Sequence, residues 1–231
     1  MSKKNTKKEK LKEESAPLDP PVDDELGILD DRQIVIINNM DPPQNSQDRY
    51  RTVLVCGDIT EESSAQIMSS LLYYSSPAVN PPNNLNEPPL QGDVEAIRFH
   101  ISTCGGSAFE MFGIYDMMRN IREETPIETF GVGKVMSAGV LLLAAGTKGR
   151  RKIGKNCRVM IHGLMGGYHG NIMNMENEIT EVKWTQERYI ESLVEESFLS
   201  KKKIKNMLSK QVDVYLSAEQ AVKYGIADIV V

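Results

Sequence analysis

The 231-residue chain carries 27 Lys and Arg against 32 Asp and Glu, a net charge of −5, and 40% hydrophobic residues. These values are typical of one globular domain, and the negative charge argues against a nucleic-acid partner. Cys56, Cys104 and Cys157 have neither disulfide-framework nor zinc-ligand spacing, so we expect a reducing compartment and no bound metal. The longest apolar run, 140–145, is too short to span a membrane, and the N-terminus lacks the apolar segment of a signal peptide. A cytoplasmic protein without a membrane partner is expected.

The N-terminal part and one internal segment are expected to lie outside the core. Residues 1–31 are rich in Lys and Glu and then in Pro and Asp, with few side chains to bury, so we expect a disordered extension. A single domain is placed at 32–231, where Gln33–Ile37 could add a strand. Within it, residues 75–92 contain five Pro and four Asn, which predicts a long exposed loop.

Apolar spacing and capping residues predict the elements in order. Strands are expected at Thr52–Cys56, Val94–Ser102, Ile127–Val132, Cys157–Ile161 and Ile226–Val231. Helices are expected after the cap Thr60 (apolar positions Ala65, Met68, Leu71 and Leu72), at Ser107–Arg122, Ser137–Ala145 and Met175–Leu199, between Ser200 and Ser209, and after the capping box of Ser217 and Gln220. Intervening segments are interpreted as a tight turn at Thr103–Gly106, a basic turn at Lys148–Lys155 and a Gly-rich loop at Gly163–Gly170. The alternation of strands and helices predicts an α/β fold.

Ser137 begins an apolar helix after a Gly-flanked strand, and this position has two interpretations. A hydroxyl at a helix N-terminus is well placed as a nucleophile, because unpaired backbone amides there favour negative charge. Serine is also a preferred helix cap. Several other motifs are excluded: there is no phosphate-binding loop, Gly131-x-Gly133 lacks a third glycine, and Val135 stands where a nucleophile elbow needs Gly.

One Ser, one His and one Asp occupy three separate turns. Ser137 starts a helix, His162 follows a strand, and Asp213 precedes Leu216-Ser217. Acyl transfer needs such a set, because the imidazole takes the hydroxyl proton and the carboxylate orients the imidazole. The oxyanion also needs two aimed N–H donors. Any chain of this length contains the three residue types, so the grouping alone leaves both interpretations of the serine open.

Five co-linear blocks give the chain a resemblance to the ClpP family, the proteolytic subunit of the Clp protease, over roughly residues 50 to 231. The blocks are Ala108–Tyr115 followed by Asp116, Ser137-x-Gly139 with its Leu-Leu-Leu-Ala-Ala-Gly ending, Arg158–His162, Gly166–Gly170, and Leu216–Ala218 with Ala221 and Tyr224-Gly225. The resemblance implies a spiral of β-β-α units, as in crotonase-like folds, with a protruding handle helix. The handle region is implied at 163–199.

The resemblance also implies an activity, a serine-type endopeptidase acting on unfolded polypeptides inside an oligomeric chamber. Ser137 matches the nucleophile, His162 the general base and Asp213 the orienting acid, while the backbone amides of Gly106 and Ala138 match the oxyanion hole. Heptameric rings, two stacked into a tetradecamer, are implied as the assembly. A separate AAA+ unfoldase of the ClpX, ClpA or ClpC type is implied as the consumer of ATP, so this chain needs no cofactor.

The chain departs from the family pattern at several positions, and alternatives stay open. Cys104 replaces a proline before the double glycine, Ala138 replaces the methionine after the nucleophile, and Val212 stands where many members have an arginine that couples the rings. A catalytically silent ring subunit of a mixed complex is one alternative. A crotonase-like acyl-CoA enzyme is another, and a Ser137–Lys134 dyad is a mechanistic variant.

Overall fold

A largely parallel sheet organises the part of the chain that the computed structural model describes, residues 51–76, 95–167, 170–209 and 212–231. The strands are β1 (Thr52–Ile59), β2 (Ile97–Gly106), β3 (Ile127–Met136), β4 (Arg151–Ile153), β5 (Arg158–Ile161), β6 (Val214–Leu216) and β7 (Ile229–Val230). The helices are α1 (Glu61–Ser75), α2 (Ala108–Ile121), α3 (Ala138–Ala144), α4 (Ile172–Glu196), α5 (Lys201–Leu208) and α6 (Ala218–Lys223). The α/β fold class is confirmed. The expectations for residues 1–31 and for a strand at Gln33–Ile37, and nearly all of those for 75–92, lie outside the described residues.

Strand β3 divides the sheet into two branches. The order is β1-β2-β3-β4-β7, with β5 pairing both β3 and β6. Residues Thr129–Gly131 of β3 pair with β4, whereas Lys134–Met136 pair with β5, and both pairings are parallel. The fork therefore places the C-terminal ends of β3 and β5 side by side. In parallel α/β sheets, these ends are where functional side chains gather.

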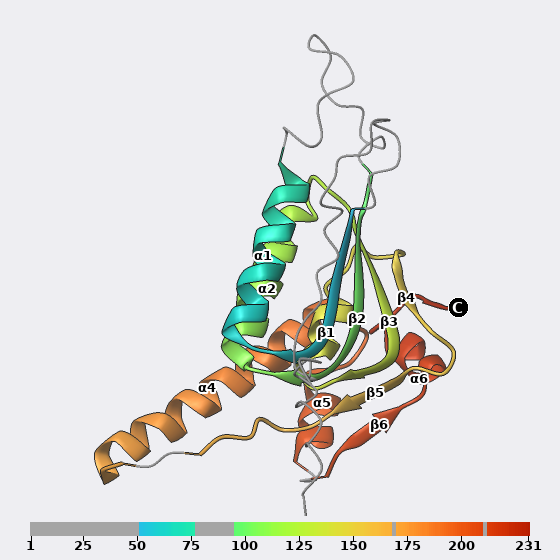
Figure 1. The fold of residues 1–231 in the computed structure, drawn as a ribbon. Coiled ribbons are helices and arrows are strands. Elements are labelled where there is room, and N and C mark those ends of the chain that lie inside the picture. The colour runs from blue at the N-terminus through green and yellow to red at the C-terminus, as the bar shows by residue number, and fades with distance from the viewer. Residues whose placement is uncertain (1–50, 77–94, 168–169, 210–211) are drawn as a thin grey trace, which may run out of the picture. The chain divides into compact units, whose positions relative to one another are not determined.

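Helices α1 and α2 lie side by side against one face of the sheet (Figure 1). Their buried faces, alternate residues of β1, β2 and β3, and the wholly buried helix α3 contribute to the core. Thr60 caps α1 in a capping box, and Ser107 caps α2. Parallel β-α-β crossovers need such covering helices, because a parallel sheet buries apolar side chains.

Several sequence predictions need correction. The segment Thr103–Gly106 is the end of β2 rather than a tight turn, because β1 also continues past Gly57 and pairs with it. The basic turn contains β4, and β6 was not predicted, since three-residue strands carry too little pattern. Two of the apolar positions predicted for α1 are exposed, Ala65 and Leu72, and Leu72 is 57% exposed. The buried face of α1 includes Ser64 and Ser70, polar residues that an apolar pattern leaves out.

Helix α4 has two halves with different surroundings. All residues from 171 to 184 are exposed, and this half projects away from the sheet (Figure 1). The C-terminal half is buried through Thr185, Tyr189, Ile190, Leu193 and Glu196, and it packs on α3. The exposed half nevertheless carries large apolar side chains: Ile172, Met173, Met175, Ile179, Val182 and Trp184. It therefore presents an apolar surface that the described chain does not cover.

Buried charges tie the end of α4 to the rest of the domain. The carboxylate of Glu196, 2% exposed, accepts hydrogen bonds from Arg122 at 2.7 and 3.1 Å and from Lys148 at 2.8 Å. Tyr115 donates a further hydrogen bond at 3.2 Å. Burial alone would raise the pKa of Glu196, but the hydrogen bonds from Arg122 and Lys148 hold it below its ordinary value.

Replacing Glu196 with Gln should lower the free energy of unfolding at neutral pH by about 3 kcal/mol, because two cations lose their buried counter-charge. A carboxylate with a depressed folded pKa stabilises above its unfolded pKa, and that contribution is lost as pH falls through the folded pKa. The difference between wild type and variant should therefore shrink in acid. Urea denaturation at pH 7 and pH 4 measures it, and an equal difference at both pH values would contradict the argument.

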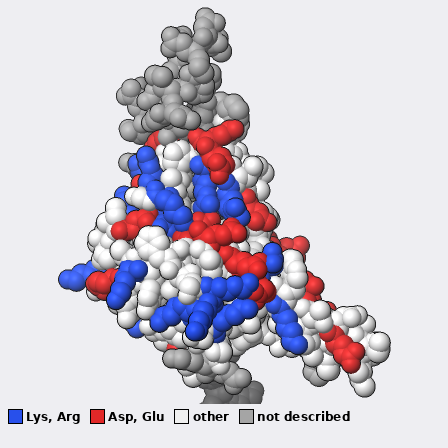
Figure 2. All heavy atoms as spheres, turned by 180° about the vertical axis from the view of Figure 1, so that it is seen from behind, with Lys and Arg blue, Asp and Glu red and all other residues white. Residues whose placement is uncertain are grey.

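The described surface is mixed in charge. Figure 2 shows Lys and Arg side chains interspersed with Asp and Glu over the face seen from behind. In the described ranges, no helix has the length and apolar character needed to cross a membrane.

Candidate active site

Ser137 stands at the junction of β3 and α3 in a strained conformation. Its φ of 53° and ψ of −121° make it the one non-glycine residue with positive φ in the described chain. Such backbone conformations are unfavourable and persist at functional sites that the surroundings hold in place. The backbone N–H of Ser137 donates to the Met160 carbonyl at 2.8 Å. The bond ties the strained residue to β5, the strand that leads to His162.

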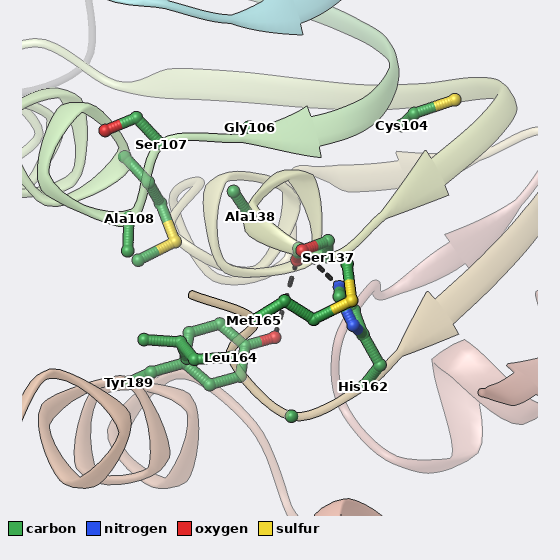
Figure 3. Close-up of a pocket in the computed structure, with 12 residues that line it drawn as sticks. Cys104, Gly106, Ser107, Ala108, Ser137, Ala138, His162, Leu164, Met165 and Tyr189 are labelled. Atoms are coloured by element: carbon green, nitrogen blue, oxygen red, sulfur yellow. Dashed lines mark hydrogen bonds between the residues drawn. The ribbon is translucent and has the colours of Figure 1, made fainter. Parts of the chain in front are cut away.

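The side chain of Ser137 is paired with His162. Ser137 Oγ lies 2.7 Å from His162 Nε2, whereas the hydroxyl makes no capping hydrogen bond to α3 (Figure 3). With the imidazole proton on Nδ1, Nε2 accepts the hydroxyl hydrogen. The interpretation of Ser137 as a helix cap is therefore wrong, because its side chain does not cap α3. The arrangement is that of a nucleophile and its general base.

The glycine pair at the end of β2 lies directly above Ser137. A Cβ on Gly105 would come within 2.6 Å of Ser137 Cβ, and Gly105 has a φ of +108°. A Cβ on Gly106 would come within 2.2 Å of the Ile59 carbonyl oxygen. No side chain fits at either position, so the backbone of β2 approaches Ser137 closely.

Two backbone amides are available near Ser137. Ser107 donates its N–H to Ile59 of β1 at 2.8 Å. Because amides alternate in direction along a strand, the Gly106 N–H turns away from β1. Ala138 is the first residue of α3, where amides have no intrahelical acceptor. Gly106, Ala138, Ser137 and His162 all line one cavity of about 290 Å³ (Figure 3).

The rest of the cavity wall is largely apolar. Ala108 and Met111 come from α2, Leu164 and Met165 follow His162, and Tyr189 comes from α4. None of these residues, Tyr189 included, was predicted from the sequence as a site residue. An aromatic hydroxyl inside an otherwise apolar helix stripe is the signal that would have marked Tyr189.

Asp213 lies next to the last paired residue of β6, but it does not form a hydrogen bond with His162 or Ser137 in the described chain. It is exposed and, among the described residues, makes no hydrogen bond or ion pair with His162. Strands β5 and β6 are antiparallel, with Ile161 opposite Val214 as the last pair. One pair further along the same register, Asp213 would face His162. Directly opposed residues have Cβ atoms about 5 Å apart, which is within reach of a carboxylate after a side-chain rotation.

Lys134 and Cys104 are not part of the Ser137–His162 pair. Lys134 is exposed, and a hydrogen bond with Cys104 is the main cause that raises the pKa of its ammonium group. A raised pKa makes the amine a poorer base near neutral pH. In Figure 3 the Cys104 side chain points away from Ser137. Within the described ranges, no three His, Cys, Asp or Glu side chains gather to hold a metal ion.

A serine hydroxyl hydrogen-bonded to an imidazole at the end of a parallel strand, beside the glycine pair that ends β2, is the arrangement found in enzymes of the serine-hydrolase class. Comparison with known proteins narrows this class, because a family model described as Clp protease matches residues 38–231. The chain therefore belongs to the Clp protease family.

Individual relatives agree with the family assignment. The chain is 30% identical over 182 residues to the ATP-dependent Clp protease proteolytic subunit 1 of Prochlorococcus marinus subsp. pastoris, covering 79% of this chain and 84% of the relative. It is 33% identical over 141 residues to the proteolytic subunit of Deinococcus radiodurans, covering 61% and 67%. It is 32% identical to proteolytic subunit 1 of Salinibacter ruber, covering 78% and 70%.

Replacing Gly105 with Ala should slow the reaction of Ser137 with a fluorophosphonate by about 100-fold, since the new Cβ displaces the nucleophile and small displacements have effects of this size. Gly149→Ala is a matched control. Gly149 also has positive φ, at +84°, but a Cβ there meets nothing within 4 Å. If labelling were slowed equally in both variants, the loss would be due to backbone strain and not to the contact with Ser137.

Proposed function

We propose that the chain is a serine endopeptidase subunit that hydrolyses peptide bonds of unfolded proteins. The observation that carries the proposal is the 2.7 Å contact between Ser137 Oγ and His162 Nε2, made by a serine in a strained backbone conformation. Membership of the Clp protease family supports the same chemistry.

The proposed reaction is acyl transfer in two steps. Ser137 Oγ attacks the carbonyl carbon while His162 Nε2 accepts its proton, and the resulting oxyanion takes hydrogen bonds from the amides of Gly106 and Ala138. His162 then protonates the leaving amine. Water, deprotonated by the same imidazole, hydrolyses the acyl-enzyme and regenerates the hydroxyl. Asp213 is proposed to accept a hydrogen bond from the Nδ1–H of His162, and the antiparallel register of β5 and β6 supports this role.

Assembly into heptameric rings, two of them stacked, is part of the proposal. The exposed half of α4 supports it, because soluble monomers rarely expose a contiguous apolar surface of this kind. The proposed partner is an AAA+ unfoldase ring that uses ATP and supplies unfolded chains, since relatives are named ATP-dependent proteolytic subunits. Native mass spectrometry should find multiples of seven chains. A monomer at micromolar concentration would contradict the ring.

The activity is tested by hydrolysis of short fluorogenic peptides, which need no unfoldase, by the assembled protein. Wild type should hydrolyse them, and Ser137→Ala, assembled to the same mass, should not. Asn120→Ala, an exposed change on α2, serves as the purification control. An assembled wild type without hydrolysis above the Ser137→Ala background would contradict the enzyme and favour a silent ring subunit.

A further inference from the structure

Two polar side chains on the buried half of α4 form hydrogen bonds with the backbone at the site, one at Ser137 and one just after His162. The Tyr189 hydroxyl donates to the Ser137 carbonyl at 3.5 Å, and Figure 3 shows this hydroxyl pointing toward Ser137. Gln186 Oε1 accepts the backbone N–H of Leu164 at 3.3 Å. Gln186 and Tyr189 are three residues apart, so they share one helix face.

Tyr189 is held as a hydrogen-bond donor by its surroundings. Its side chain is only 4% exposed, and its ring forms part of the cavity wall. Burial raises the pKa of Tyr189 far above its ordinary value, so the hydroxyl keeps its proton at any working pH. A buried phenol hydroxyl needs an acceptor, and here the acceptor is the carbonyl of the nucleophile residue itself.

The peptide unit after Ser137 needs such support because its conformation is unfavourable. The carbonyl of Ser137 accepts the Val140 N–H at 3.0 Å in addition to the Tyr189 hydroxyl. The N–H of Ser137 is fixed separately by Met160. A strained residue keeps its conformation only while such bonds determine it. The Tyr189 hydroxyl therefore helps to direct Ser137 Oγ toward the imidazole.

Gln186 acts on the other partner. Strand β5 ends at Ile161, directly before His162. The amide oxygen of Gln186 binds Leu164, two residues beyond His162, and it lies 3.3 Å from where a Cβ on Gly163 would stand. This contact fixes the path of the chain just after the base.

We infer that Tyr189 and Gln186 are positioning residues that hold Ser137 and His162 in register from a single helix face. The inference rests on the proposed function and deepens it. It assigns the buried half of α4 a role in the alignment of the reacting groups, beyond packing on α3.

Tyr189→Phe and Gln186→Leu test the inference in the assembled full chain. Each should lower kcat for a fluorogenic peptide, and the rate of fluorophosphonate labelling of Ser137, by about threefold to tenfold, as expected for loss of one hydrogen bond. KM should stay within about twofold, because neither group is proposed to bind substrate. Gln186→Glu keeps an acceptor oxygen and should recover most of the labelling rate.

Thr185→Val is the matched control from the same helix. Thr185 is buried, and its hydroxyl has no hydrogen-bond partner in the described residues, so its removal should leave both rates unchanged. Wild-type rates in Tyr189→Phe and Gln186→Leu would overturn the inference while leaving the proposed function intact. A rise in KM at constant kcat would also overturn it, because the residues would then act on substrate binding. Wild type without labelling would instead remove the proposed function, and the inference with it.

Discussion

Replacing His162 with alanine should reduce peptide hydrolysis by about 10⁴-fold or more. The serine hydroxyl is a weak nucleophile until a base accepts its proton, and His162 Nε2 stands 2.7 Å from that hydroxyl. Loss of the base from a serine nucleophile costs rates of this order, and the remaining activity comes from binding and the oxyanion hole. Steady-state hydrolysis of a fluorogenic peptide by the assembled variant measures the loss.

A second variant, measured in the same assay, distinguishes His162 as the base from a Ser137–Lys134 dyad. Lys134→Met should change the rate by no more than about threefold, because the ammonium is exposed and interacts with Cys104. If the chain worked as a dyad, His162→Ala would keep most of the rate and Lys134→Met would abolish it. The two variants therefore give opposite results under the two mechanisms.

Replacing Asp213 with Asn should lower kcat by about 10³-fold with little change in KM. Asparagine keeps the size of the side chain, but it cannot stabilise the imidazolium or hold the Nδ1 proton in the productive tautomer. The expectation depends on the register of β5 and β6, which would set Asp213 opposite His162. Steady-state kinetics of the assembled variant across pH 6–9 provides the test.

Asp116→Asn is the matched control for this prediction. Asp116 is also exposed and lies on α2, away from β5 and β6. It should leave kcat unchanged. If kcat is also unchanged in Asp213→Asn, the proposed role of Asp213 is contradicted, and Ser137 and His162 work without a carboxylate.

The order of elements was accessible from the sequence because local signals specify it. Capping at Thr60, Ser200 and Ser217 agrees with the structure, since a cap depends on residues within one turn. Strand β6 and the fork of β3 depend on pairing between distant segments. No local pattern carries that information, and the extension of β2 through its glycines was missed for the same reason.

The candidate site was likewise predictable only in part. The residues Ser137, His162, Gly106 and Ala138 were named from the sequence, and they line one cavity. The sequence could not decide whether the serine was a cap or a nucleophile, because serine suits both positions. The choice depends on a contact with His162, 25 residues away. Tyr189 and Gln186 were missed because their partners lie on other elements.

The most direct test of the account is the mass of the assembled protein after reaction with a fluorophosphonate, followed by peptide mapping of the adduct. A single adduct per chain on Ser137 is predicted for wild type, and no adduct is expected in His162→Ala on the same time scale. An unmodified wild type, or an adduct on another residue, would contradict the assignment of Ser137 as the nucleophile.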